Sequence, residues 1–233
     1  MRLPTSWRFS GEAAPKLGLK IITYSIRCRP YGPAWPFKNQ QTWSVFHFVK
    51  ALKGDALNNS AEIPMLTGSP LRYLNRDNQV EAFDIFAEMV APTRPEKRPT
   101  VVLVPIPGCK AICADDVRRG TTYRMAEAIG QRLGVKVEPC LWWSEPMLSS
   151  HRENGPRDPA ILVPKLVLGA VPTGSVVLVD DVLTSGGHLR AAHCMLRRAG
   201  ARVLFGVCAA KQRDAEEGDM FKRVEHELEE FDE

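Results

Sequence analysis

The sequence predicts an α/β fold, with a doubly wound, mainly parallel sheet of about five strands and an irregular N-terminal segment. Two observations predict it. First, the runs 101–104 and 176–179 are short and uninterruptedly apolar, as in strands that are covered on both faces. Second, these runs alternate with segments in which apolar residues recur every three to four positions, as on one face of a helix. Strands that alternate with helices in this way form parallel sheets with helices on both faces.

The first segment, 1–78, is expected to be basic and irregular, with few helices or strands. Pro30, Pro33 and Pro36 interrupt any regular structure there, and 43–52 is expected to form one short helix. Residues 1–53 carry nine Lys and Arg against a single Glu, a net charge of +8. This basic head is expected to dock partly on the rest of the chain, although binding to a polyanion is an alternative.

The α/β domain is expected to span 79–212 and to open with a helix over 79–90. The buried face of this helix is predicted to comprise Val80, Phe83, Phe86 and Val90. Asp77 or Asn78 can cap its start, and Pro92 ends it and begins a linker over 92–99.

The remaining elements follow in strict alternation. The predicted elements are a strand over 101–104, a helix over 120–133 ending at Gly134, a strand over 135–141, a strand over 176–179, a helix over 189–199 ending at Gly200, and a strand over 202–208. The stretch 142–164 is long and irregular, which is typical of a functional lid or of disorder. Residues 213–233 form the last predicted part, an acidic tail.

Composition excludes several classes of protein. With 44% hydrophobic and 25% charged residues, the 233-residue chain is not a disordered, collagen-like or coiled-coil protein. No run approaches the ~20 apolar residues of a membrane span, and the first residues lack the apolar core of a signal peptide, so we expect a cytoplasmic protein without a membrane partner. The six cysteines are scattered, which favours free thiols over a zinc site.

The strongest motif is the segment Val176-Val177-Leu178-Val179-Asp180-Asp181-Val182-Leu183-Thr184-Ser185-Gly186-Gly187-His188. We interpret it as a buried strand that ends in two carboxylates, followed by a small-residue loop and a helix. Ligands of open α/β sheets bind beyond the carboxyl ends of the strands. The free N–H groups at the helix start suit a phosphate, and the carboxylates suit sugar hydroxyls or Mg²⁺ held through water. The segment therefore predicts a site for a ribose 5-phosphate.

A second loop follows the strand over 101–104. It comprises Pro105, Ile106, Pro107, Gly108, Cys109 and Lys110. Gly108 is expected to allow an unusual backbone conformation, and Lys110 is expected to make a charge-assisted contact with an anion. Because this loop lies one strand–helix step before the two carboxylates, it is expected to belong to the same site.

These two loops resemble those of the type I phosphoribosyltransferases. The segment 180–187 is similar to that family's loop for phosphoribosyl pyrophosphate (PRPP), and 107–110 to its pyrophosphate loop. The resemblance implies that Asp180 and Asp181 hold the ribose hydroxyls, that 182–187 binds the 5-phosphate, and that Mg²⁺ is the cofactor. The family usually has Thr where His188 stands, so an imidazole replaces one hydroxyl donor.

Within the family, the chain resembles the ComF-like branch, proteins associated with competence. The basic cluster Arg118-Arg119-Gly120 and the segment Phe48–Asp55 carry that likeness, whereas the branch's four-cysteine zinc module is absent from this sequence. The resemblance covers about 100–210 and implies an unidentified acceptor and a homodimer. It puts Arg118 or Arg119 on the pyrophosphate, although a solvated pair of arginines is the alternative.

Other side chains of the predicted lid have two interpretations. Trp142 and Trp143 could stack on a base, but paired tryptophans more often pack in a core or an interface. Arg152, Arg157 and Lys165 could close over phosphates or simply be solvated.

Two functions remain open from the sequence. The first is a phosphoribosyltransferase that depends on Mg²⁺ and PRPP and releases pyrophosphate. The second is a regulatory protein that senses PRPP or a nucleotide without efficient catalysis. His188 and the basic head favour the second, and the head could then contact nucleic acid in a salt-dependent manner.

Overall fold

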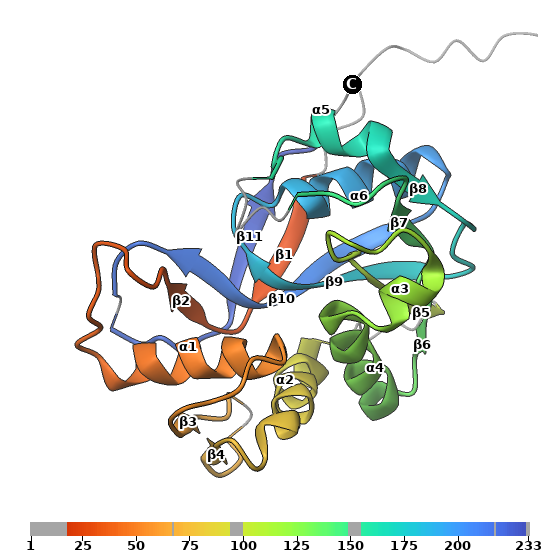
Figure 1. The fold of residues 1–233 in the computed structure, drawn as a ribbon. Coiled ribbons are helices and arrows are strands. Elements are labelled where there is room, and N and C mark those ends of the chain that lie inside the picture. Colours follow the sequence, from red (N-terminus) through yellow and green to blue (C-terminus); the bar gives the residue numbers. More distant parts are fainter. Residues whose placement is uncertain (1–17, 67, 94–99, 149–154, 217, 232–233) are drawn as a thin grey trace, which may run out of the picture.

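The computed structural model describes residues 18–66, 68–93, 100–148, 155–216 and 218–231 (Figure 1). Residues 1–17 of the basic head, most of the linker over 92–99, and Arg152 in the predicted lid lie outside the described residues. Within the described ranges no helix is both long and apolar enough to cross a bilayer.

The fold is mixed α/β, and the strands of its main sheet are mostly parallel. These strands are β1 (Leu19–Thr23), β2 (Ile26–Cys28), β5 (Val101–Pro105), β6 (Lys136–Val137), β9 (Ser175–Leu183), β10 (Val203–Arg213) and β11 (Val224–Leu228). They are ordered β11-β1-β10-β9-β5-β6. β2 lies off this path and pairs with the C-terminal end of β10. All pairs are parallel except that of β11 with β1. The predicted fold class, a doubly wound and mainly parallel sheet, is confirmed.

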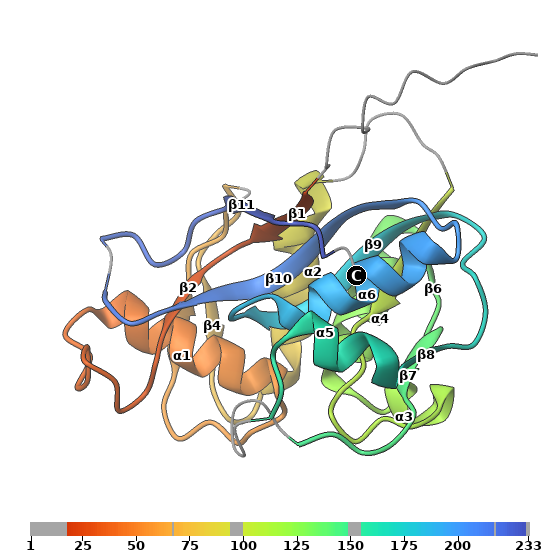
Figure 2. The same ribbon diagram turned by 90° about the horizontal axis from the view of Figure 1, so that it is seen from above.

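The helices cover both faces of this sheet (Figures 1 and 2). They are α1 (Gln40–Leu52), α2 (Ala82–Val90), α3 (Ala114–Arg118), α4 (Thr121–Leu133), α5 (Pro159–Leu162) and α6 (Gly187–Arg198). Two small two-stranded sheets pair β3 (Ala61–Ile63) with β4 (Arg72–Leu74) and β7 (Leu141–Trp143) with β8 (Leu166–Leu168). Because side chains alternate along a strand, Val177 and Val179 pack with α1, α2 and α4, whereas Val176 and Leu178 pack with α5 and α6.

The strand content differs from the expectation at both ends of the chain. The expected irregular segment supplies β1 and β2, and the expected acidic tail supplies β11, so the described part of the sheet has seven strands rather than about five. β10 itself runs across the expected boundary at 212/213. The strands were missed because β1 and β2 lie about 185 residues from their partner β10, and because the acidic residues of 211–233 concealed the alternating pattern of β11.

The helix predictions hold with small shifts. The helix expected over 79–90 begins with the 3₁₀ turn Gln79–Glu81, in which Val80 is 64% exposed instead of lying on the buried face. α4 ends before Gly134 (φ 66°) and α6 ends close to Gly200 (φ 81°), both in the left-handed region that favours glycine. The strand expected over 135–141 is split: β6 joins the main sheet, and β7 pairs with β8.

Candidate functional site

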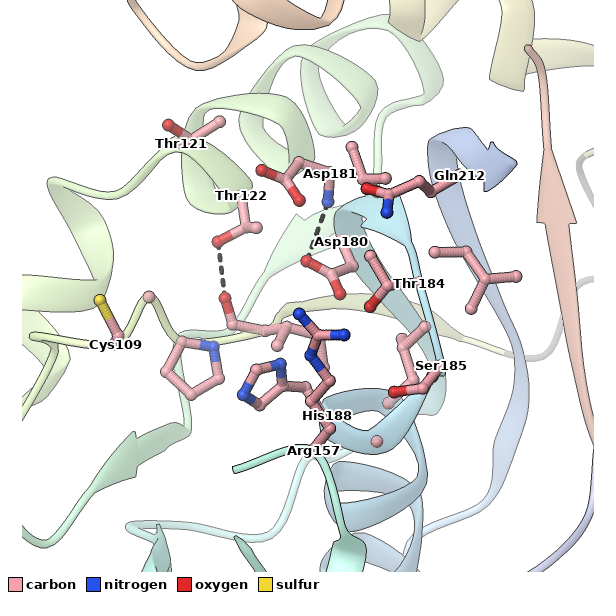
Figure 3. Close-up of a pocket in the computed structure, with 18 of the residues that line it drawn as sticks. Cys109, Thr121, Thr122, Arg157, Asp180, Asp181, Thr184, Ser185, His188 and Gln212 are labelled. Atoms are coloured by element: carbon pink, nitrogen blue, oxygen red, sulfur yellow. Dashed lines mark hydrogen bonds between the residues drawn. The ribbon is translucent and has the colours of Figure 1, made fainter. Parts of the chain in front are cut away.

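A cavity of about 350 Å³ opens at the carboxyl ends of β5, β9 and β10 (Figure 3). Its lining comprises Arg27, Lys53, Ile106, Pro107, Gly108, Cys109, Thr121, Thr122, Arg157, Asp180, Asp181, Val182, Leu183, Thr184, Ser185, Gly186, Gly187, His188, Leu189 and Gln212. All nine residues of the predicted PRPP loop therefore lie on one cavity. Its volume falls in the ordinary range for small-molecule sites.

The two carboxylates belong to the strand rather than to the loop after it. β9 continues to Leu183, because its pairing with β10 runs as far as Lys211. Asp180 and Asp181 are consequently held by a central strand of the sheet, which fixes their backbone positions. Such positions suit groups that must be placed accurately against a ligand.

The turn that follows β9 brings backbone close to the cavity. Gly186 has φ 79°, in the region where side-chain-bearing residues are strained. A Cβ on Gly187 would lie 1.8 Å from the backbone oxygen of Arg157, so only glycine permits this close approach. The N–H groups of the first turn of α6 have no partner within the helix. This turn lines the cavity, and it is the positive end of the helix dipole. This geometry is suited to an anion.

A lysine from the neighbouring strand fastens the turn. Lys211 Nζ donates to the backbone oxygen of Thr184 at 2.6 Å. Burial lowers the pKa of the Lys211 ammonium, and the charge of Arg213 acts in the same direction. The turn is thus tied to β10 and not only to its own helix.

The two aspartates occupy different electrostatic environments. Asp180 Oδ1 accepts a hydrogen bond from the Asp181 backbone N–H at 2.9 Å, whereas Asp181 Oδ2 lies 2.8 Å from Lys53 Nζ. Burial, followed by the charge of Asp181, raises the pKa of Asp180 from 3.8 to about 8. Because the two adjacent carboxyl groups have different partners, they can take different roles toward one ligand.

His188 stands at the start of α6 between an aromatic ring and a cation. Its ring meets that of Trp143 edge-on, with the centroids 5.6 Å apart. Figure 3 shows its side chain beside that of Arg157, on the same side of Asp180. Burial lowers the pKa of His188, an effect that Arg157 strengthens and Asp181 opposes. Burial therefore favours the neutral imidazole, which offers one N–H donor.

The structure brings three of the four residues of the predicted pyrophosphate loop, 107–110, to the cavity. Pro107, Gly108 and Cys109 line it, whereas Lys110 is exposed and is not among the lining residues. The expectation for Gly108 was wrong: its φ is not positive, and an added Cβ would meet no atom within 4 Å. A hydrogen bond from α4 anchors the loop: Thr122 Oγ1 donates to the backbone oxygen of Ile106 at 2.7 Å.

Arg118 and Arg119 do not reach the cavity. Arg118 Nη1 lies 2.6 Å from Asp115 Oδ1, and Arg119 Nη2 lies 3.7 Å from Asp116 Oδ1. Both side chains are more than half exposed. In this structure they form local ion pairs at the surface of α3.

The lid residues divide between core and surface. Trp143 is 1% exposed and packs in the core, and the ring of Trp142 lies against Gly169. Lys165 Nζ pairs with Glu145 Oε1 at 2.7 Å, away from the residues that line the cavity. Among the charged lid residues that the structure describes, Arg157 is the one that lines the cavity.

Sequence reasoning assigned no site role to five polar residues of the cavity wall: Arg27, Lys53, Thr121, Thr122 and Gln212. Arg27 comes from β2 and Lys53 from the end of α1, both in the segment that was expected to be irregular. A basic residue directly after the helix over 43–52 was visible in the sequence, but nothing local indicated which part of the molecule it would face. Within the described residues, no three His, Cys, Asp or Glu side chains gather as a metal cluster would.

Comparisons with known proteins give structural neighbours only. No family model and no curated protein sequence matches the chain. The chain is similar in fold to adenine phosphoribosyltransferase from Thermoanaerobacter pseudethanolicus, with 16% identity, 65% of this chain and 94% of that chain covered, and a TM-score of 0.36. It is also similar to adenine phosphoribosyltransferase from Saccharomyces cerevisiae (15% identity, 72% and 89% covered, TM-score 0.36) and to orotate phosphoribosyltransferase from Aeropyrum pernix (16% identity, 71% and 81% covered, TM-score 0.36).

Proposed function

We propose that this protein is a phosphoribosyltransferase that uses PRPP, releases pyrophosphate and transfers the ribose 5-phosphate to a nitrogen acceptor. One observation carries the proposal: a single cavity holds two strand-borne carboxylates, a glycine turn at a helix N-terminus, and the loop after the adjacent strand. Carboxylates accept hydrogen bonds from sugar hydroxyls, and helix N-termini bind phosphate. The cavity thus offers complementary groups to both ends of a ribose 5-phosphate.

The turn after β9 would bind the 5-phosphate. The backbone N–H groups from Ser185 to His188, together with the hydroxyl groups of Thr184 and Ser185, supply hydrogen-bond donors. Arg157 lines the same part of the cavity and adds a guanidinium, which matches phosphate geometry. Asp180 and Asp181 would then accept from the ribose hydroxyls.

The leaving diphosphate would lie over the loop after β5. Pro107, Gly108 and Cys109 form that wall of the cavity, and Lys53 brings a cation near Asp181. The donor set fits Mg²⁺, which keeps several waters and binds one or two carboxylates together with substrate phosphates; Asp180 and Asp181 would hold it. When bound, the ion would neutralise charge on the diphosphate.

The reaction is a displacement at the ribose C1. The bond from C1 to the diphosphate oxygen breaks, and that oxygen leaves with the electron pair. The lone pair of the acceptor nitrogen forms the new bond to C1, and a proton carried by that nitrogen passes to water. Carboxylates beside the ribose favour the positive charge that develops on the ring. Exclusion of water from the site during the reaction would protect PRPP from hydrolysis.

We further propose the ComF-like branch as the nearest type. Lys53, which lines the cavity, belongs to the segment Phe48–Asp55 that resembles this branch. The alternative, sensing of PRPP without turnover, is favoured by His188, whose ring packs on Trp143 where a hydroxyl is expected.

The test combines calorimetric titration with PRPP and a pyrophosphate-release assay over a panel of nitrogen acceptors. We expect PRPP to bind the wild-type protein, and Asp181→Asn to abolish turnover while thermal stability changes little. Asp77→Asn, at an exposed turn away from the cavity, is the matched control and should retain full activity. Binding without turnover for every acceptor would establish the sensing alternative. Absence of PRPP binding would refute both.

A further inference from the structure

The guanidinium of Arg27 is a buried cation in the cavity wall that the function proposed above does not use. Arg27 lies on β2, is 7% exposed and lines the cavity. Its Nε has no hydrogen-bond partner. Burial lowers the pKa of this guanidinium, whereas the charges of Asp181 and Asp55 act in the opposite direction. A buried charged group with an unsatisfied donor is costly, so a ligand group that pairs with it would gain a strong interaction.

Gln212 lies directly beside Arg27. The two residues are paired in register between β10 and β2, which run parallel, and both line the cavity. Side chains in register on neighbouring strands extend from the same face of a sheet. The carboxamide and the guanidinium therefore form one polar subsite, here called the Arg27–Gln212 wall.

This wall lies on the far side of the carboxylates from the loop after β5. In the sheet β9 stands between β10 and β5. Figure 3 accordingly shows Gln212 and Cys109 on opposite sides of Asp180. If the diphosphate lies over 107–109, a nucleophile that displaces it in line must approach C1 from the other side. The Arg27–Gln212 wall is where that nucleophile would be held.

We propose that the Arg27–Gln212 wall binds the acceptor, and that the acceptor is a nitrogen heterocycle bearing a carboxylate. This inference rests on the proposed function and specifies its second substrate. A guanidinium pairs with a carboxylate through two parallel hydrogen bonds. The amide of Gln212 can both donate and accept, so it can contact a ring N–H or C=O of the same heterocycle. The carboxylate is unchanged in the reaction, since only the ring nitrogen forms a bond to C1.

The first experiment compares matched acceptors at saturating PRPP with the full-length wild-type protein. The probes are uracil-6-carboxylate and imidazole-4-carboxylate, each paired with its carboxamide. For at least one pair we expect kcat/KM of the carboxylate to exceed that of the amide by about 10–100-fold, the range of a charge-assisted hydrogen bond. Where no acceptor turns over, equilibrium binding of the same pairs to the PRPP-loaded protein replaces kcat/KM as the readout.

The second experiment tests Arg27 itself. Arg27→Gln should lower the preference for carboxylate over carboxamide by about 10-fold or more, and it should leave the Kd for PRPP within about twofold. Arg27→Lys, which keeps the charge but loses the fork of donors, should restore part of the preference. The control Arg29→Gln removes an exposed arginine two residues further along and should change neither quantity.

The outcomes separate this inference from the proposed function. If PRPP binds but carboxamides react or bind as well as the carboxylates, the acceptor assignment is overturned while the transferase proposal stands. If Arg27→Gln weakens PRPP and every acceptor equally, Arg27 serves only as a structural counter-ion of Asp181, and the assignment also fails. If PRPP does not bind to the wild type, both proposals fail together.

Discussion

Lys53 Nζ lies 2.8 Å from Asp181 Oδ2, so a residue that follows α1 reaches a carboxylate on the central strand β9. Both side chains are about a quarter to a third exposed, and such pairs contribute only about 0–1 kcal/mol to folding. Both also line the cavity. This ion pair should therefore contribute more to the free energy of ligand binding than to the free energy of folding.

Lys53→Gln is expected to weaken PRPP binding by about 10–100-fold, the range for loss of a charged hydrogen bond. The affinity for ribose 5-phosphate, which lacks the diphosphate, should fall by a smaller factor. Calorimetric titration of both ligands measures the difference. Lys50→Gln, in the last turn of the same helix but not on the cavity, serves as the control. Equal losses for the two ligands would show that Lys53 does not act on the diphosphate.

Gly187→Ala is expected to displace the backbone of Arg157, because the new Cβ would lie 1.8 Å from its oxygen. Overpacking of this kind costs about 1–3 kcal/mol. Thermal unfolding and a titration with ribose 5-phosphate should both show a loss. Gly218→Ala, where an added Cβ meets nothing within 4 Å, should leave both measurements at the wild-type value. Full phosphate affinity in Gly187→Ala would mean that this close approach does not shape the site.

Asp180 should make the unliganded protein less stable as the pH rises. Its pKa is raised from 3.8 to about 8 by burial and by Asp181, so between these values the folded state holds a proton that the unfolded state has lost. Stability must fall through that window. Asp180→Asn removes the ionisation, and its melting temperature should exceed that of the wild type increasingly from pH 4 to pH 8, by about a few degrees.

The same variant should lose PRPP binding, because PRPP with Mg²⁺ would displace the proton of Asp180 and bind its carboxylate, and an amide cannot replace that charge. Gain of stability with loss of binding is the pattern expected of a strained functional site. A stability difference that does not change with pH would contradict the raised pKa.

His188 should bind anions as a neutral ring. Burial lowers its pKa, so sulfate, whose charge is constant over this range, should bind the wild type and His188→Thr with parallel pH dependence between pH 7 and 8. The variant loses the ring contact with Trp143 and should be about 0.5–1.5 kcal/mol less stable. A rise in wild-type affinity from pH 8 to pH 7 that the variant lacks would reveal an imidazolium in the site.

The parts of the site that the sequence predicted are those encoded locally. The run from Val176 to His188 contains its own strand, turn and helix start, so its position at the end of a sheet follows from neighbouring residues. The loop over 107–109 was found in the same way. Lys110, one residue further along, is exposed instead. The residue types in a loop do not determine which of its side chains face the cavity.

The parts that were missed depend on pairing across the chain. Arg27 meets Gln212 only because β2 pairs with β10, some 185 residues later. β11 did leave a local sign, since Val224, His226 and Leu228 alternate with two glutamates, the pattern of a half-buried strand. The excess of acidic residues in 211–233 concealed it.

The placement of β1 and β2 also bears on how the molecule is made. Their neighbour β10 is about 180 residues away in the chain, which a ribosome adding 5–20 residues per second takes roughly 10–40 s to reach. Until then Ile21, Ile22 and Ile26 have no sheet to join, although all three are buried in the finished protein. The wall that carries Arg27 therefore cannot form until β10 has been made, and the cavity is completed only late in synthesis.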